Sequence, residues 1–141
     1  MERPKKVLIM DGQGGKIGKM LVEQIKRRCP AQELIALGTN SIATSAMLKA
    51  GADQGATGEN PVLVNCADAD LIVGPVGILM ADSLLGEITP SMAVAVGRSP
   101  AQKILVPVNR CHMTVAGIGQ YTLTEYVEMA AQMAAEYIQA G

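Results

Sequence analysis

The stretch that decides the fold runs from Val7 to Gly18 and reads VLIMDGQGGKIG. Its first four residues are a continuous apolar run, which predicts a strand buried on both faces, as in a parallel sheet. Four glycines then fall within seven residues. Apolar residues recur at helical spacing over residues 17–28 and predict an amphipathic helix. A buried strand, a glycine-rich turn and a helix in this order are typical of the first unit of a doubly wound α/β sheet.

The rest of the chain continues the alternation of strands and helices. Further strands are predicted at residues 33–37, 71–73 and 104–106, with weaker candidates at 53–57 and, at the sheet edge, at 113–118. Helices are predicted at residues 17–28, 41–50, 59–68, 77–85, 90–96 and 123–139. The pattern predicts a three-layer, doubly wound, mostly parallel Rossmann-like sheet. With the strand at 53–57 the sheet has six strands in the order 3-2-1-4-5-6, and without it a five-stranded flavodoxin-like sheet is expected.

Length and composition limit the chain to one domain with an aliphatic core. The 141 residues fit a single domain, residues 1–141, and leave no room for a second one of ordinary size. The chain has no Phe, no Trp and three Tyr, but nine Met, and 49% of its residues are hydrophobic. The core must therefore be built from Val, Ile, Leu, Ala and Met.

Charge and cysteine usage exclude several classes of function. The formal net charge is −1, without the basic stripe of a nucleic-acid-binding protein or a polybasic membrane patch. The three cysteines, Cys29, Cys66 and Cys111, show no Cys-x-x-Cys spacing, and a single histidine, His112, cannot complete a zinc site. We expect no metal. The start of the chain lacks the pattern of a signal peptide, so a cytoplasmic location is expected.

The glycine-rich turn has the properties of a phosphate-binding loop. Glycine adopts positive φ at little cost and lets an anion approach the backbone, while the first amides of the following helix point at that anion. We therefore expect the loop to hold the phosphates of a nucleotide, with Gly18 allowing close packing of helix and strand. A carboxylate beside phosphates is repulsive, so Asp11 is expected to cap the loop. The residues predicted to bind are Asp11, Gly12, Gln13, Gly14, Gly15, Lys16 and Ile17.

The loop departs from the strict Gly-x-Gly-x-x-Gly pattern because residue 17 is Ile. Its form, Gly12-x-x-Gly15-Lys16-Ile17-Gly18, resembles the Gly-x-x-Gly-Arg-Met-Gly loop of dihydrodipicolinate reductases and, more loosely, the loop of short-chain dehydrogenases. The resemblance implies that Lys16 contacts a cofactor phosphate. The alternative is a tight strand-to-helix turn that requires glycine for its geometry alone.

Two further segments are expected to complete the ligand site. The end of the second strand, where a dinucleotide-binding protein usually carries an acid for the ribose, reads Gly38-Thr39-Asn40. The missing carboxylate favours NADP or a mononucleotide over NAD, although no Arg beside Thr39 is available for a 2′-phosphate. Gly74, Pro75 and Val76 follow the strand at 71–73 and form either the opposite wall or an ordinary turn.

Catalytic candidates are few. Asn109-Arg110-Cys111-His112 follows a strand and offers a general acid or base in His112, an anion clamp in Arg110 and a nucleophile in Cys111. Neighbours on an extended chain point in opposite directions, so the three cannot share one pocket. Asp82 and Glu87 lie in an apolar region, where a surface role is expected unless one is functional. No Tyr-x-x-x-Lys pair of a short-chain dehydrogenase is present.

The final helix has two apolar faces separated by a polar stripe. One face, with Leu123, Val127, Ala134 and Ile138, suffices to pack on the sheet. The other is rich in Met and Tyr, like surfaces that partners bury. We expect a homodimer, unless the chain's own loops cover this face. The second face consists of Tyr126, Met129, Met133 and Tyr137.

Several segments, spread over nearly the whole chain, resemble a family of short bacterial proteins known as domain of unknown function 3842. They are DGQGG at 11–15, ALGTN at 36–40, GADQGATGEN at 51–60, VGP at 73–75 and ADSLLGEITP at 81–90. The resemblance implies a Rossmann-like fold and no particular substrate. Our first expectation is a module that binds NADP or NAD, with or without oxidoreductase activity. The alternatives are a non-catalytic sensor of a nucleotide or coenzyme A, and a structural oligomer with an unused site.

Overall fold

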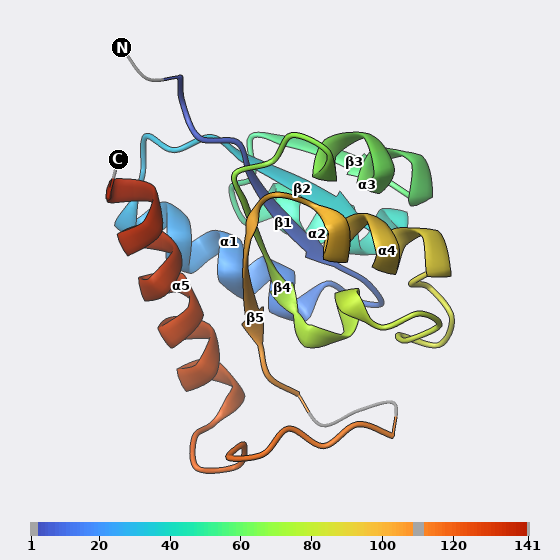
Figure 1. Cartoon of the computed structure of the whole chain (residues 1–141). Helices are drawn as coiled ribbons and strands as arrows, with labels where there is room; N and C mark the ends of the chain where they lie inside the picture. Colours follow the sequence, from blue (N-terminus) through green and yellow to red (C-terminus); the bar gives the residue numbers. More distant parts are fainter. Residues whose placement is uncertain (1–2, 109–111, 141) are drawn as a thin grey trace.

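The computed structural model describes residues 3–108 and 112–140. Five parallel strands form one sheet in the order β3-β2-β1-β4-β5 (Figure 1). The strands are β1 (Val7–Asp11), β2 (Leu34–Gly38), β3 (Gln54–Thr57), β4 (Leu71–Pro75) and β5 (Gln102–Val106). The helices are α1 (Lys16–Arg28), α2 (Ser41–Lys49), α3 (Glu59–Cys66), α4 (Pro90–Arg98) and α5 (Leu123–Gln139), with a 3-10 helix, η1 (Val76–Leu79). The predicted α/β, doubly wound class is confirmed.

The central strand shows why the chain forms three layers. Residues 7–10 of β1 are fully buried, and successive side chains of a strand point to opposite faces of the sheet. Val7 and Ile9 join the core under α1, α2 and α5, whereas Leu8 and Met10 join the core under α3 and α4. Both faces are covered by helices (Figure 1). A continuous apolar run is therefore required at β1 rather than an alternating one.

Two predicted elements differ in the structure. Residues 113–118 form turns and irregular backbone rather than an edge strand, and Gly117 has a φ of 87°. The sheet keeps β3 and has five strands in the described part of the chain, in the order predicted for the six-stranded sheet but without its sixth strand. The flavodoxin-like order is wrong. The helix predicted at 77–85 is limited to η1, because Asp82, Leu84 and Leu85 adopt positive φ, which is incompatible with a right-handed helix.

Helix ends follow the expected capping rules. Thr122 accepts a hydrogen bond from the amide of Glu125, whose side chain bonds back to the Thr122 amide, and this capping box opens α5. Lys26, Arg27 and Arg28 stand in the last turn of α1, where they complement the helix dipole. Within residues 3–108 and 112–140, no helix is long and apolar enough to cross a membrane.

Candidate functional site

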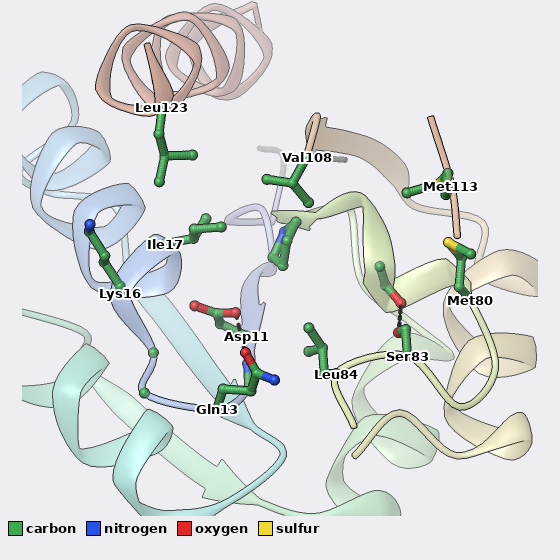
Figure 2. A pocket seen from close by; sticks show the side chains of 15 residues that line it. Asp11, Gln13, Lys16, Ile17, Met80, Ser83, Leu84, Val108, Met113 and Leu123 are labelled. Atoms are coloured by element: carbon green, nitrogen blue, oxygen red, sulfur yellow. Dashed lines mark hydrogen bonds between the residues drawn. The ribbon is translucent and has the colours of Figure 1, made fainter. Parts of the chain in front are cut away.

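A cavity of about 190 Å³ lies at the carboxyl ends of β1 and β4, where parallel sheets of this type bind ligands. Figure 2 shows the glycine loop on one side of the cavity and the connection between η1 and α4 on the other. The glycine loop is the turn from Gly12 to Gly18. The cavity lining comprises Asp11, Gly12, Gln13, Gly14, Gly15, Lys16, Ile17, Pro75, Gly77, Met80, Ser83, Leu84, Val108, Met113 and Leu123.

The glycines of the loop serve different purposes. Gly15 has a φ of 74° and precedes the first residue of α1, and a Cβ there would lie 2.9 Å from the Cα of Ala43 in α2. Gly15 is therefore required by the turn and by helix packing. A Cβ on Gly14 would meet no described atom within 4 Å, and the residue is exposed. The backbone at Gly14 is thus accessible from outside, as a loop that contacts a ligand requires.

Asp11 caps the loop from inside, as its position in the sequence predicts. Its carboxylate is buried at the end of β1, with Oδ1 accepting from the amide of Gly12 at 2.8 Å and Oδ2 from the amide of Gly18 at 2.7 Å. Gly18 lies in the first turn of α1, where backbone amides have no acceptor within the helix. The carboxylate therefore fixes the shape of the loop and engages one first-turn amide.

Three other amides of the loop have no acceptor among the described residues. The Gly15 amide donates to the carbonyl of Gly12 at 2.9 Å, which closes the turn. In the part of the chain that the structure describes, no group accepts from the amides of Gly14, Lys16 and Ile17. The Lys16 side chain begins at the same turn and is exposed. Unpaired amides and the positive end of a helix dipole can bind a phosphate, and a lysine adds charge.

A second cluster of polar groups lies beside the cavity, at the end of β2. Glu87, from the η1–α4 connection, places Oε1 where three donors meet. The donors are the Gln13 amide at 2.7 Å, the Thr39 hydroxyl at 2.5 Å and the Asn40 side-chain amide at 3.0 Å. Burial alone would raise the pKa of the Glu87 carboxyl, but the three hydrogen bonds outweigh burial and hold that pKa below its usual value.

The Glu87 cluster changes one premise of the sequence analysis. The end of β2 carries no acid of its own, but the structure supplies a carboxylate there from a residue 48 positions beyond Thr39. No local pattern connects the two segments. The sequence marks Glu87 only as a charge in an apolar region and predicts a surface role for it unless it, rather than Asp82, is functional. The cluster in fact ties three connections together, because the Asn40 side chain also donates to the carbonyl of Gln13.

The structure brings together most of the residues predicted to bind a ligand. All seven residues from Asp11 to Ile17 line the cavity, as does Pro75. Thr39 and Asn40, next to Gly38 at the end of β2, reach the glycine loop through Glu87. Gly38, Thr39, Asn40, Gly74 and Val76 are not part of the cavity lining.

Gly74 has a packing role instead. A Cβ at that position would collide with the backbone carbonyl of Met10 on the neighbouring strand. Gly38 is constrained in the same way, because a Cβ there would collide with Thr44 in α2. Both glycines are thus needed for close approach within the fold.

Of the catalytic candidates, the structure describes His112. His112 is exposed and has a φ of 61°, and it is next in sequence to Met113, which lines the cavity. Arg110 and Cys111 lie outside the described residues. The hydroxyl of Ser83, a cavity residue, donates to the carbonyl of Gly77 at 2.5 Å. Residues 3–108 and 112–140 contain no group of three or more His, Cys, Asp or Glu that could hold a metal ion.

One side of the cavity is an apolar wall, whose residues were not predicted from the sequence. It comes from segments far apart in the chain, so that its members cannot be recognised by spacing. Figure 2 shows them facing the glycine loop from the η1–α4 connection, the chain after β5 and the start of α5. The wall consists of Met80, Leu84, Val108, Met113 and Leu123.

Comparisons with known proteins identify a family and one structural neighbour. Residues 6–139 match the family model described as "Domain of unknown function (DUF3842)". No curated protein matches the chain. A solved structure described as "crystal structure of AibC" aligns with 98% of this chain and 41% of its own, at 16% identity and a TM-score of 0.44. The chain spans about two fifths of the length of that protein.

Proposed function

The chain belongs to the DUF3842 family, and from the geometry of its site we propose that it is a nucleotide-binding protein that takes an NAD(P)-type dinucleotide. The observation that carries the proposal is the cavity at the glycine loop, which is lined by Gly14, Lys16 and Ile17. The backbone amides of these three residues have no acceptors among the described residues. In this arrangement the phosphates bind these amides and the Lys16 ammonium.

The size and lining of the cavity support a ligand with both charged and apolar parts. The phosphate side is polar backbone, whereas Met80, Val108 and Met113 present an apolar surface suited to a flat ring. About 190 Å³ is less than the roughly 300–1,000 Å³ of pockets that enclose a whole drug-sized ligand. The cavity would therefore hold the phosphates and one adjoining group, with the remainder of the nucleotide lying along the protein surface.

Calorimetric titration of the protein with NADH, NADPH, ATP and coenzyme A tests the proposal. We expect saturable binding of at least one dinucleotide, with stoichiometry of one per chain, and weaker competition by inorganic pyrophosphate at the same site. Tight binding of coenzyme A alone would refute dinucleotide binding and favour the alternative, a non-catalytic sensor of coenzyme A. Absence of binding by all four compounds would refute the proposal and favour a structural role for the chain.

We also propose that the chain forms a homodimer through α5. Of its predicted core-facing residues, Val127 and Ala134 are fully inaccessible, whereas Leu123 and Ile138 are half-buried. On the other face, Met129 and Met133 keep 39% and 55% of their surface exposed. The chain covers Tyr126 of this face in part, because the amide of Gly119 donates to its hydroxyl and its ring stacks edge-on with Tyr121. The methionines thus form the apolar surface that a second copy would bury.

Replacement of Met133 by Glu is expected to convert the dimer to a monomer. A charge at this exposed position costs the single chain little, but it would be buried without a partner in a symmetric interface. Sedimentation velocity of both proteins measures the effect. Leu85→Glu is the matched control, because Leu85 is 93% exposed and lies away from α5. A wild-type protein that sediments as a monomer would contradict the proposal.

A further inference from the structure

Glu87 lies where a dinucleotide would place its ribose. In sheets of this type the phosphates bind at the first strand–helix turn, and a carboxylate at the end of the second strand accepts hydrogen bonds from the ribose hydroxyls. Here β1 and β2 are neighbours, and the pairing of Asp11 with Gly38 aligns their carboxyl ends. The Glu87 carboxylate reaches this point from the η1–α4 connection, residues 80–89, and bonds Thr39 directly after β2.

The close contact between Glu87 and the glycine loop depends on the absence of a side chain at Gly12. A Cβ on Gly12 would lie 2.8 Å from Oε1 of Glu87 and 2.5 Å from the hydroxyl of Thr39. Gly12 therefore leaves the space that lets the carboxylate approach. Gly12 and Gln13 border both the cavity and the Glu87 carboxylate, so a phosphate at the loop and a group at Glu87 would be neighbours.

The two oxygens of Glu87 have different surroundings. All three hydrogen bonds of the cluster end on Oε1. Among residues 3–108 and 112–140, none donates to Oε2, and the Glu87 side chain is half-buried rather than enclosed. The first oxygen thus orients the carboxylate, while the second is available to hydroxyl groups of a ligand.

We propose that Glu87 is the residue that selects the ribose of the bound nucleotide, accepting hydrogen bonds from its 2′ and 3′ hydroxyls and repelling a 2′-phosphate. The inference rests on the proposed function and assigns the site to dinucleotides with an unmodified ribose, of the NAD type, over those of the NADP type. The carboxylate is ionised at neutral pH, since its hydrogen bonds hold its pKa below the usual value. A phosphate beside it would meet a like charge, and no described cation contacts Glu87 to offset that charge.

Equilibrium dissociation constants for NADH and NADPH, measured with wild type and Glu87→Gln, test the inference. Gln keeps the shape of the side chain and one acceptor oxygen, so the cluster can still form. We expect wild type to bind NADH at least tenfold more tightly than NADPH, and Glu87→Gln to reduce that ratio about tenfold by gaining affinity for NADPH and losing some for NADH.

Glu59→Gln is the matched control. Glu59 also accepts a hydrogen bond from a threonine hydroxyl, that of Thr89, but it lies on α3 outside the cavity lining. This variant loses the same charge and should keep the wild-type ratio. Thermal melting of both variants verifies folding. The wild-type comparison needs no variant, so it tests the inference even if Glu87→Gln unfolds.

The possible results separate the two proposals. If both dinucleotides bind and Glu87→Gln leaves their ratio unchanged, Glu87 only fastens the connections together and the inference is wrong while the proposed function stands. If the variant binds both more tightly by the same factor, Glu87 obstructs the site, and the inference is again wrong. A wild-type preference for NADPH also contradicts it. Failure of wild type to bind either compound refutes both proposals.

Discussion

Replacing Gly14 with Asp is expected to weaken dinucleotide binding about a hundredfold while leaving the fold intact. A side chain at this position meets no described atom within 4 Å, and the backbone there is not in a positive-φ conformation. The new carboxylate would lie roughly 5 Å from a phosphate at the loop, where like charges at a partly exposed site repel by about 3 kcal/mol. That energy corresponds to about two powers of ten in affinity.

Gly97→Asp is the matched control for this variant. Gly97 is exposed on α4, away from the cavity, and a Cβ there would be 3.9 Å from its nearest neighbour, Leu79. Both variants add one negative charge, so a general electrostatic effect would appear in both. Calorimetric titration with the best ligand measures affinity, and melting measures stability. Equal affinity of Gly14→Asp and wild type would place the phosphates elsewhere.

Replacing Asp11 with Ala is expected to destabilise the protein by about 3 kcal/mol, because the buried amides of Gly12 and Gly18 lose their acceptors. For a chain of this size the loss corresponds to a decrease in Tm of roughly 10 °C. Asp11→Asn keeps one acceptor oxygen and should fall between Ala and wild type. Thermal unfolding followed by circular dichroism gives the order of stability of the three proteins.

Asp68→Ala is the control that shows whether the loss of stability in Asp11→Ala is specific to Asp11 or follows from removing any aspartate. Asp68 forms an exposed ion pair with Lys6, and such pairs contribute little because water screens them. Its Tm should remain close to that of wild type. If the Tm of Asp11→Ala is close to that of Asp68→Ala rather than far below it, the Asp11 carboxylate does not stabilise the glycine loop.

The elements that the sequence predicts well are those whose pattern is complete within one segment. The apolar run of β1, the periodicity of α1 and the Thr122–Glu125 capping box of α5 are local signals, and all three are confirmed. Residues 113–118 show the limit of such signals. They carry apolar residues that suit a strand, but a strand also needs a neighbour to pair with, and no local pattern tells whether the sheet edge at β5 accepts one.

The candidate site likewise has a part that a local sequence pattern predicts and a part that depends on the tertiary fold. The segment from Asp11 to Ile17 is contiguous, so the sequence alone could predict that its seven residues line one site. Glu87 could not, because it meets Thr39 through a connection whose path depends on positive φ at Leu84 and Leu85. Leucine rarely adopts positive φ, so the sequence does not predict this conformation at either residue. The apolar wall is hidden for the same reason, since Val108 and Leu123 become neighbours only through the tertiary fold.

If the chain binds a nucleotide as proposed, the carboxylate of Asp11 also affects the rate at which the site is occupied. Because this side chain supplies the acceptors inside the turn, the loop acquires its shape as the chain folds rather than when a ligand arrives. A preorganised loop loses little conformational entropy on association. Diffusion and orientation of the proposed nucleotide would then govern the rate of binding, and differences in affinity among nucleotides would arise mainly from their dissociation rates.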